Sequence, residues 1–246
     1  MTDTTDSGVP NTGAPNTGAP NTGATNTGAP NTEAANTGAT TGGATNPAWI
    51  RLIPYAESEG QLRALYDRVK GPGDRVDNVM RAHSLRPHTM EGHSALYKSV
   101  LHHAGNTTPV WFLETLGICT SLANSCAYAV AHHYAGLCRL VGEERGRAIF
   151  AALADGSPEA VFSGRELALL RYVRKLTLSP QAMVEGDIDA LREAGATDED
   201  ILEANQVCAY FNYSNRLLNG LGVTTDGDVL GLSPPNTGTL DDWEHA

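Results

Sequence analysis

The sequence predicts an all-α fold. It contains no run of alternating β-branched residues and no Asn-Gly turn between two such runs, which are the usual signals of paired strands. Capping residues, prolines and glycines, which mark where helices begin and end, are frequent instead. The helical segments between them are joined by short connections. We therefore expect a single compact multi-helix domain of about eight or nine helices, packed as in helical bundles.

The first expected helix begins with a capping box, in which the side chains of Ser58 and Gln61 bind backbone N–H groups. This helix is expected to end at Gly71, because Pro72 cannot continue the helical hydrogen-bond pattern. A short helix is expected around Ile188. The other helices are expected to begin at or close to a capping residue, a proline or a glycine: Asp77, Pro87, Thr108, Asn124, Gly142, Ser163 and Thr197.

Two of these later helices carry further signals. Ser163 and Glu166 form a second capping box, and the helix that they open is expected to stop before Pro180. Thr197 is expected to cap a long helix that ends near Gly220. Both ends of these two helices are therefore predicted from local residues.

The start of the chain differs from the rest in composition. Residues 11–40 repeat a unit close to Asn-Thr-Gly-Ala-Pro, and the segment 1–46 contains no lysine or arginine. Such a segment buries too little apolar surface to offset the entropy lost on ordering the backbone, so we expect 1–46 to be a disordered tail. The helical domain is expected over 47–232. Because Asn-Thr-Gly returns at 236–238, we expect 233–246 to be a C-terminal tail.

Charge and hydropathy narrow the classes of partner. The chain has 28 acidic and 17 basic residues, a formal net charge of -11, so we expect no nucleic-acid partner and no binding to anionic membranes. No stretch reaches the roughly 18–20 apolar residues that span a bilayer, and we expect no secretory signal, because residues 1–46 contain neither a basic region nor an apolar one. The 4 cysteines lie in apolar helical segments, which is typical of a reduced protein. We therefore expect a cytoplasmic protein that acts on a small molecule.

The segment 111–138 contains the side chains best suited to chemistry. If Asn124 or Ser125 caps a helix, Cys126 lies in its first turn, where unpaired backbone N–H groups and the helix dipole favour the thiolate. His133 lies on the same helix face, about 10 Å further along the axis. A third group is therefore needed to connect the thiol and the imidazole.

Glu114, in the preceding helix, is the natural third group. Its neighbours in the sequence are apolar, and if it is buried among them its pKa should rise, so that it could relay a proton near neutral pH. Tyr128 and His132 have the i, i+4 spacing of a shared helix face. We expect no metal site, because the adjacent side chains of His132 and His133 diverge by about 100° around a helix.

The order and spacing of these residues resemble the core motif of the alkylhydroperoxidase D-like / carboxymuconolactone decarboxylase superfamily, in its peroxidase-related branch. That motif is a glutamate followed by Cys-x-x-Cys-x-x-x-His at a helix start, and Glu114, Cys126 and His133 take three of its places. The segments 77–87 and 211–223 also resemble that branch, so the resemblance covers essentially the whole helical domain. It implies an alkylhydroperoxidase D-like domain and a homo-oligomer, of trimer or hexamer type.

The sequence departs from this motif at one position. Redox members carry a second cysteine, which is expected to attack the peroxide before the first cysteine closes a disulfide, and this chain has Ala129 there. A Cys-x-x-Cys disulfide cycle therefore cannot operate. The first functional hypothesis is a peroxidase-like oxidoreductase in which Cys126 alone is oxidised to sulfenic acid and reduced by an external thiol, while Glu114 and His133 relay protons.

Two other hypotheses stay open. One is a cofactor-independent acid–base enzyme of decarboxylase, lyase or isomerase type, in which Glu114 and His133 move protons on a small carboxylated substrate. The other is a non-catalytic, oligomeric descendant. No metal or other cofactor is expected in either catalytic hypothesis. The further side chains expected to contact the substrate are Tyr128, Ala129, His132 and Arg216. The arginine would bind an anionic group with two hydrogen bonds.

Overall fold

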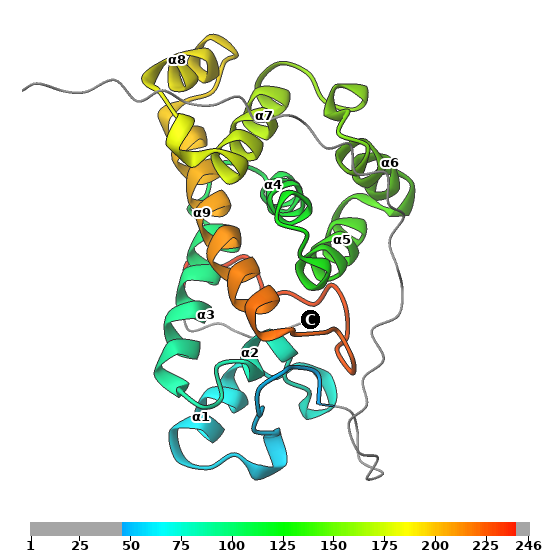
Figure 1. Ribbon diagram of the computed structural model, residues 1–246, viewed down its shortest axis with the longest axis vertical. Coiled ribbons are helices and arrows are strands. Elements are labelled where there is room, and N and C mark those ends of the chain that lie inside the picture. Colours follow the sequence, from blue (N-terminus) through cyan, green and yellow to red (C-terminus); the bar gives the residue numbers. More distant parts are fainter. Residues whose placement is uncertain (1–45, 240–246) are drawn as a thin grey trace, which may run out of the picture. The chain divides into compact units, whose positions relative to one another are not determined.

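The computed structural model of the protein describes residues 46–239. Within this range the chain forms nine α-helices and four short 3-10 helices, and no β-strand (Figure 1). The α-helices are α1 (Gly60–Val69), α2 (Asn78–Arg81), α3 (Pro87–Leu101), α4 (Val110–Ala123), α5 (Ala127–Val141), α6 (Glu143–Ala154), α7 (Gly164–Leu178), α8 (Glu185–Glu193) and α9 (Asp198–Leu221). The predicted all-α fold is confirmed. The tail predicted over 1–46 lies outside the described residues, apart from Asn46.

Helix α4 lies at the centre of the domain. It packs against α5, α6, α7 and α9, and Figure 1 shows it nearly end-on between these helices. Every residue from 112 to 121 is buried, as in helices that are apolar on all sides. A polar side chain on this part of α4 must therefore find its partner inside the protein, and this constraint applies to Glu114.

The contact between α4 and α9 requires a small residue. Gly117 lies against the ring of Phe211, and a Cβ atom added at this glycine would overlap with that ring. The same ring meets the imidazole of His133 edge-on, with ring centroids 4.6 Å apart. The close approach of α4 and α9 therefore leaves the Phe211 ring in contact with His133, a candidate site residue on α5.

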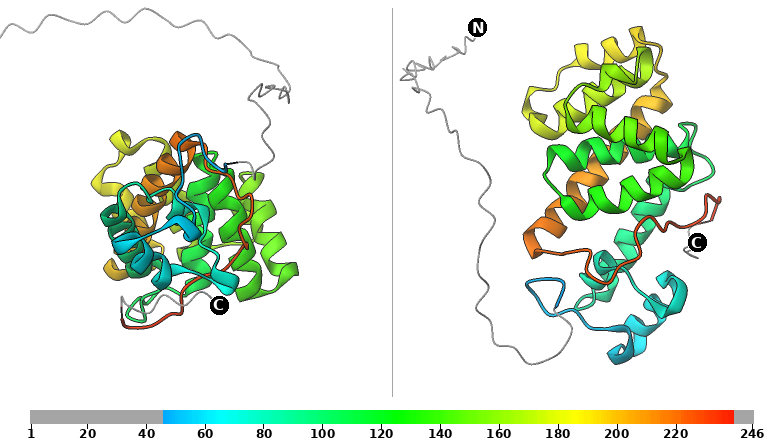
Figure 2. Two further views of the ribbon diagram at one scale, coloured as in Figure 1. Left: turned by 90° about the horizontal axis from the view of Figure 1, so that it is seen from below. Right: turned by 90° about the vertical axis from the view of Figure 1, so that its right-hand side faces the viewer.

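After α9 the chain returns across the domain as residues 222–239, called the C-terminal segment below. This segment runs beside α5 (Figure 2), and a Cβ atom added at Gly231 would come within 2.7 Å of the backbone of Ala135. Further along, Thr237 exchanges two backbone hydrogen bonds with the turn that follows α3. The first residues of the tail predicted over 233–246 are thus hydrogen-bonded to the helical domain.

The helix starts follow the prediction closely, with two differences at the capping side chains. The Ser58 hydroxyl donates a hydrogen bond to the Tyr55 carbonyl and accepts one from Arg63, and α1 begins after it without a side-chain cap. Ser163 precedes α7 but makes no capping bond. Thr197 does cap α9, as predicted. A serine hydroxyl has several backbone and side-chain partners within reach, so the surrounding structure decides which bond it makes.

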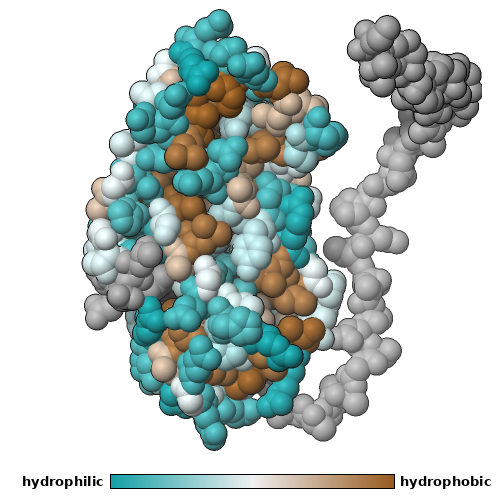
Figure 3. Space-filling view, turned by 90° about the vertical axis from the view of Figure 1, so that its left-hand side faces the viewer, coloured by the Kyte–Doolittle hydropathy of each residue, from teal (hydrophilic) through white to brown (hydrophobic). Residues whose placement is uncertain are grey.

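No helix within residues 46–239 has both the length and the apolar character needed to cross a membrane. Large apolar side chains are nevertheless exposed at separate positions, including Leu96 on α3 and Leu202 on α9. Figure 3 shows several apolar patches between polar groups on one face. The homo-oligomer that the resemblance implies stays a prediction.

Candidate active site

The turn between α4 and α5 decides the surroundings of Cys126. After α4 ends at Ala123, Ser125 adopts a left-handed conformation (φ 53°), and α5 begins at Ala127 with Cys126 as its N-cap. The predicted helix start at Asn124 or Ser125 is therefore wrong by one or two residues. The side chain of Cys126 is packed into the interior, with 1% of the residue exposed, and it is not among the residues that line the cavity described below.

Burial also decides the acidity of this thiol. Loss of solvation raises the pKa of Cys126, and the backbone N–H groups of Ala129 and Tyr128, which favour the thiolate, offset only part of this effect. The predicted stabilisation by the helix start is thus present, but desolvation is larger. The predicted lowering of the pKa is wrong, and the reactive thiolate form is disfavoured at neutral pH.

A carboxylate and an imidazole form a hydrogen-bonded pair between the two central helices. Nδ1 of His133 on α5 lies 2.6 Å from Oε2 of Glu114 on α4. The other carboxylate oxygen, Oε1, is 3.6 Å from Nε2 of His102, which lies 3.0 Å from the Tyr97 hydroxyl. Within the described residues, Nε2 of His133 makes no hydrogen bond, so this nitrogen is available to a bound molecule.

The charge of Glu114 results from opposing effects. Glu114 is only 2% exposed, and burial by itself raises its pKa. The charge and hydrogen bond of His133, together with the charge of His102, are larger, so the pKa of Glu114 lies below its ordinary value. The expected net rise of this pKa is therefore wrong, because the two histidines outweigh the effect of burial. An anionic Glu114 accepts the Nδ1–H of His133, so Nε2 is the ring nitrogen that is left for a molecule in the cavity.

A second polar cluster joins α2, α5 and the C-terminal segment. Asp228 accepts hydrogen bonds from the Tyr128 hydroxyl at 2.6 Å and from the backbone N–H of Asn78 at 3.1 Å. The Oδ2 atom of Asp228 also lies 3.2 Å from Nε2 of His132. The rings of Tyr128 and His132 are stacked with centroids 4.6 Å apart, in agreement with their predicted shared face. A single buried carboxylate thus connects three elements of the domain.

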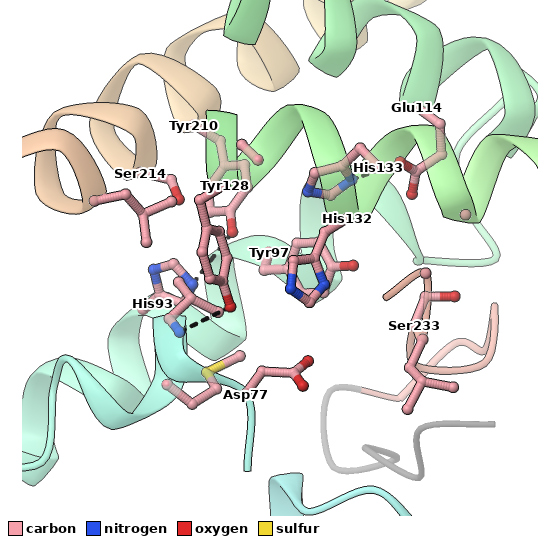
Figure 4. A pocket seen from close by; sticks show the side chains of 17 residues that line it. Asp77, His93, Tyr97, Glu114, Tyr128, His132, His133, Tyr210, Ser214 and Ser233 are labelled. Carbon is pink, nitrogen blue, oxygen red and sulfur yellow. Dashed lines mark hydrogen bonds and ion pairs between the residues drawn. The ribbon is translucent and has the colours of Figure 1, made fainter. Parts of the chain in front are cut away.

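Asp77 is the N-cap of α2, as predicted, but its side chain makes no capping bond. The carboxylate of Asp228 binds the first N–H of this helix, and the Tyr128 hydroxyl accepts the next one at 3.0 Å. The side chain of Asp77 lines the cavity instead (Figure 4). Burial raises the pKa of Asp77 to about 6; the charge of His132 opposes this rise and the charge of Asp228 adds to it.

The two clusters border one cavity with a volume of about 50 Å³. This volume accommodates a few water molecules or a small organic molecule. Figure 4 shows the Glu114–His133 pair on one side of this space and Asp77 on another. Ala129, at the place of the second motif cysteine, also lines the cavity, as does Gly231 of the C-terminal segment. The described residues that line the cavity include no lysine or arginine.

A further wall of the cavity contains an uncharged histidine. Burial lowers the pKa of His93, which lines the cavity, to about 3, and it lowers that of the neighbouring His83 to about 4. Both rings are therefore neutral at physiological pH. Nδ1 of His93 is buried without a hydrogen-bond partner among the described residues. This wall offers hydrogen-bonding capacity but no positive charge.

The structure brings five of the predicted site residues together at the cavity: Glu114, Tyr128, Ala129, His132 and His133. It does not bring Cys126 or Arg216 there. Arg216 is exposed, and its guanidinium binds the carbonyl and side-chain oxygens of Asn212 on its own helix. In the described part of the chain, no three His, Cys, Asp or Glu side chains are placed to hold a metal ion.

The sequence analysis missed two residues that line the cavity, Asp77 and His93, and one that binds the lining side chains from behind, Asp228. Asp77 was identified only as a helix cap, and Asp228 follows the last helix in a segment without periodicity or motif. His93 lies among several other histidines that form no regular stripe. The only local signal was the acidic residue at a helix start, and that signal points first to capping.

Comparison with solved structures identifies the fold. An uncharacterized peroxidase-related protein from Ralstonia eutropha JMP134, described as an alkylhydroperoxidase AhpD core, is similar over 75% of this chain and 95% of its own, with 24% identity and a TM-score of 0.65. A peroxidase-related protein from Silicibacter sp. TM1040 is similar over 75% of this chain and 94% of its own, with 20% identity and a TM-score of 0.65. This chain has the alkylhydroperoxidase D-like fold.

The alkylhydroperoxidase D-like fold is therefore confirmed as predicted. The debrominase Bmp8 also resembles the chain, over 74% of this chain and 93% of its own, with 16% identity and a TM-score of 0.57. No family model matches the sequence, and no curated protein matches it. At these identities the comparisons establish the fold, and the chemistry has to be argued from the cavity itself.

Proposed function

We propose that this protein is an acid–base enzyme that moves a proton on a small substrate, with His133 as the base and Glu114 as the residue that positions it. The observation that carries the proposal is the 2.6 Å hydrogen bond between Glu114 and Nδ1 of His133 at the wall of the cavity. An anionic carboxylate on Nδ1 makes Nε2, the other ring nitrogen, the atom that accepts a proton.

The proposed step needs only groups of this chain. Nε2 of His133 takes a proton from the bound substrate, and the electron pair of the broken bond stays on the substrate. The imidazolium that forms is stabilised by the negative charge of Glu114, which remains ionised because its pKa is held low. His133 then returns the proton to a different atom of the substrate, so the net reaction is a proton shift.

The competing proposal is a peroxidase-like reaction through the Cys126 thiol. The resemblance of Glu114, Cys126 and His133 to the motif of the redox members supports it. The burial of the sulfur and its raised pKa argue against it, because an accessible thiolate is the reactive form. Of the two cysteine positions of the motif, the one that borders the cavity holds Ala129, which has no thiol.

The test follows carbon-bound proton exchange in hydroxyacetone, a small neutral ketone used as a probe. The full-length protein is incubated with hydroxyacetone in D₂O, and loss of the probe's C–H signals is followed by proton NMR. Wild type should accelerate the exchange, and Glu114→Gln and His133→Asn should each lower the rate by about 10²–10⁴-fold. Cys126→Ser and the exposed control Glu91→Gln should keep the wild-type rate.

A second assay on the same proteins separates the competing proposal. Consumption of cumene hydroperoxide with dithiothreitol should be equal in wild type and Cys126→Ser if the acid–base proposal holds. The proposal is wrong if wild type does not accelerate exchange above the buffer rate, or if Glu114→Gln leaves the exchange rate unchanged. Loss of peroxide consumption in Cys126→Ser alone would establish the thiol reaction instead.

A further inference from the structure

The proposed proton shift needs a second group besides its base. When His133 removes a proton from a carbon atom next to a carbonyl group, negative charge develops on the carbonyl oxygen. An enzyme stabilises such a charge with a cation or with a hydrogen-bond donor that is already in place. Because the described lining of the cavity includes no lysine or arginine, we looked for this donor among its hydroxyl groups.

Tyr97 on α3 lines the cavity together with His133 on α5 (Figure 4). The two rings meet edge-on, with centroids 6.3 Å apart. Tyr97 is 8% exposed, and its hydroxyl lies 3.0 Å from Nε2 of His102. A molecule in the cavity therefore has the imidazole of His133 and the phenol of Tyr97 as neighbouring walls.

Glu114 decides which group donates in the hydrogen bond between Tyr97 and His102. Its Oε1 atom is 3.6 Å from Nε2 of His102, and this oxygen is anionic because the pKa of Glu114 lies below its ordinary value. A negative charge at this distance favours a proton on Nε2 and disfavours a lone pair there. The Nε2–H group then donates to the Tyr97 oxygen. A hydroxyl can accept and donate at the same time, so Tyr97 keeps its own O–H for a further acceptor.

The other two tyrosine hydroxyls in the described lining each have a partner that can accept their proton. Tyr128 donates to the carboxylate of Asp228 at 2.6 Å. The Tyr210 hydroxyl lies 3.3 Å from Nε2 of His93, whose ring is neutral because burial lowers its pKa. Burial also raises the pKa of Tyr97 well above its ordinary value, so this phenol stays protonated and can donate.

We infer that Tyr97 donates a hydrogen bond to the oxygen of the substrate, and that this substrate is a small neutral ketone or aldehyde with a hydrogen on the adjacent carbon. The inference rests on the proposed function, because it assigns a second group to the same proton shift. As Nε2 of His133 takes the proton from carbon, the electron pair of the C–H bond forms a C=C bond. The π pair of the carbonyl group moves onto its oxygen, where the O–H of Tyr97 stabilises it without giving up its proton.

A neutral carbonyl compound suits the charges of the cavity better than the carboxylated substrate expected from the sequence. Glu114 lines the cavity and is anionic. Arg216, the cation expected to bind a carboxylate, lies outside it. A carboxylate in this space would meet a negative charge with no described lysine or arginine to offset it, whereas a carbonyl oxygen needs only a neutral donor.

The infrared band of bound hydroxyacetone reports this hydrogen bond without turnover. The probe carries ¹³C at its carbonyl carbon, and the band is recorded with the full-length protein as an isotope difference spectrum. A donated hydrogen bond weakens the C=O bond, so the band should lie at a lower wavenumber in wild type than in Tyr97→Phe. Tyr172→Phe is the matched control, because Tyr172 is a buried tyrosine outside the cavity whose hydroxyl accepts a hydrogen bond from Asn205. Its band should match that of wild type.

Two further measurements complete the test. In the D₂O assay, Tyr97→Phe should lower the maximal exchange rate by about 10²–10³-fold, as expected for loss of one donor to a developing oxyanion. The hydroxyacetone concentration at half-maximal rate should change little, because this bond strengthens as the charge develops. Tyr172→Phe should keep the wild-type rate. Imidazole ¹⁵N shifts of wild type, which need no substitution, should show a proton on Nε2 of His102.

The outcomes are distinct. The inference is wrong if wild type gives no band of a bound carbonyl, if the band is the same in wild type and Tyr97→Phe, or if Nε2 of His102 carries no proton. A band that depends on Tyr97, without exchange by wild type, would refute the proposed function alone. Exchange by wild type that persists unchanged in Tyr97→Phe would refute this inference alone.

Discussion

Replacement of Glu114 by glutamine tests the hydrogen-bonded pair on which the proposed function depends. Glutamine has nearly the same shape, so the variant keeps the packing of α4 and removes only the negative charge that faces His133. Since Glu114 is 2% exposed, solvent cannot compensate for the lost charge. The change therefore weakens the interactions of this side chain with His133 and His102 in an otherwise unchanged core.

The magnitude follows from the kind of hydrogen bond that is lost. A hydrogen bond to a charged group contributes about 1.5–3 kcal/mol, and a neutral one contributes about 0.5–1.5 kcal/mol. The variant keeps a neutral bond from His133 to the amide oxygen, so the free energy of unfolding at pH 7 should fall by about 1–2 kcal/mol. For a domain of this size, the Tm should fall by about 2–8 °C.

The effect should depend on pH in a definite direction. The pKa of Glu114 is lowered in the folded protein, so its charge stabilises the fold at any pH above the unfolded-state pKa of about 4.3. This stabilisation is lost as the pH falls through the lower pKa of the folded state. The difference in Tm between wild type and Glu114→Gln should therefore be largest near neutral pH and should shrink in acid.

Thermal unfolding of the full chain, followed by circular dichroism between about pH 3 and 8, measures this difference. Glu91→Gln is the control. Glu91 is exposed, and its ion pair with Arg68, at 3.8 Å, is a surface pair that contributes little stability, so the Tm of this variant should match that of wild type. Imidazole ¹⁵N shifts should also place the proton of neutral His133 on Nδ1. The reasoning is refuted if Glu114→Gln and wild type unfold at the same temperature at pH 7, or if that proton lies on Nε2.

Three further predictions concern the rest of the domain. All four cysteines are buried, so no thiol, including that of Cys126, should react with a maleimide in the folded protein, and mass spectrometry showing rapid modification would contradict this. Asp228→Asn should lower the free energy of unfolding by about 1–2 kcal/mol and speed hydrogen exchange at the Asn78 amide; unchanged exchange would argue against its capping role. Gly117→Ala should lower the stability in urea by about 1–3 kcal/mol, because the added methyl group overlaps with Phe211, and a variant as stable as wild type would show that this contact relaxes freely.

Most of the helices could be predicted because the residues that start and stop them act over one turn of chain. Thr197 caps α9 and Pro87 is the first residue of α3, as the sequence indicates. The same reasoning failed for the hydroxyl of Ser58, which binds Tyr55 and Arg63 instead. Those bonds depend on how the segment before α1 folds back, and a capping pattern does not contain that information.

The candidate site could be predicted only in part, for a similar reason. The apolar neighbours of Glu114 in the sequence, together with the resemblance of Glu114, Cys126 and His133 to the family motif, pointed to the pair that the structure joins at 2.6 Å. Helical periodicity also placed Tyr128 and His132 on one face. The same local argument put Cys126 in the first turn of a helix, but a left-handed residue in the preceding turn moved it to the N-cap, and its sulfur is packed into the interior.

By itself the sequence determined the helices and the order of side chains along α4 and α5, because both depend on interactions between residues a few positions apart. Only the tertiary structure decided that Asp228 meets Asn78, 150 positions earlier in the chain, and that Asp77 therefore lines the cavity. It also decided the direction of each pKa shift, raising that of Cys126 and lowering that of Glu114. Such shifts depend on how much solvent a group loses and which charges surround it, and both are set by packing between distant segments.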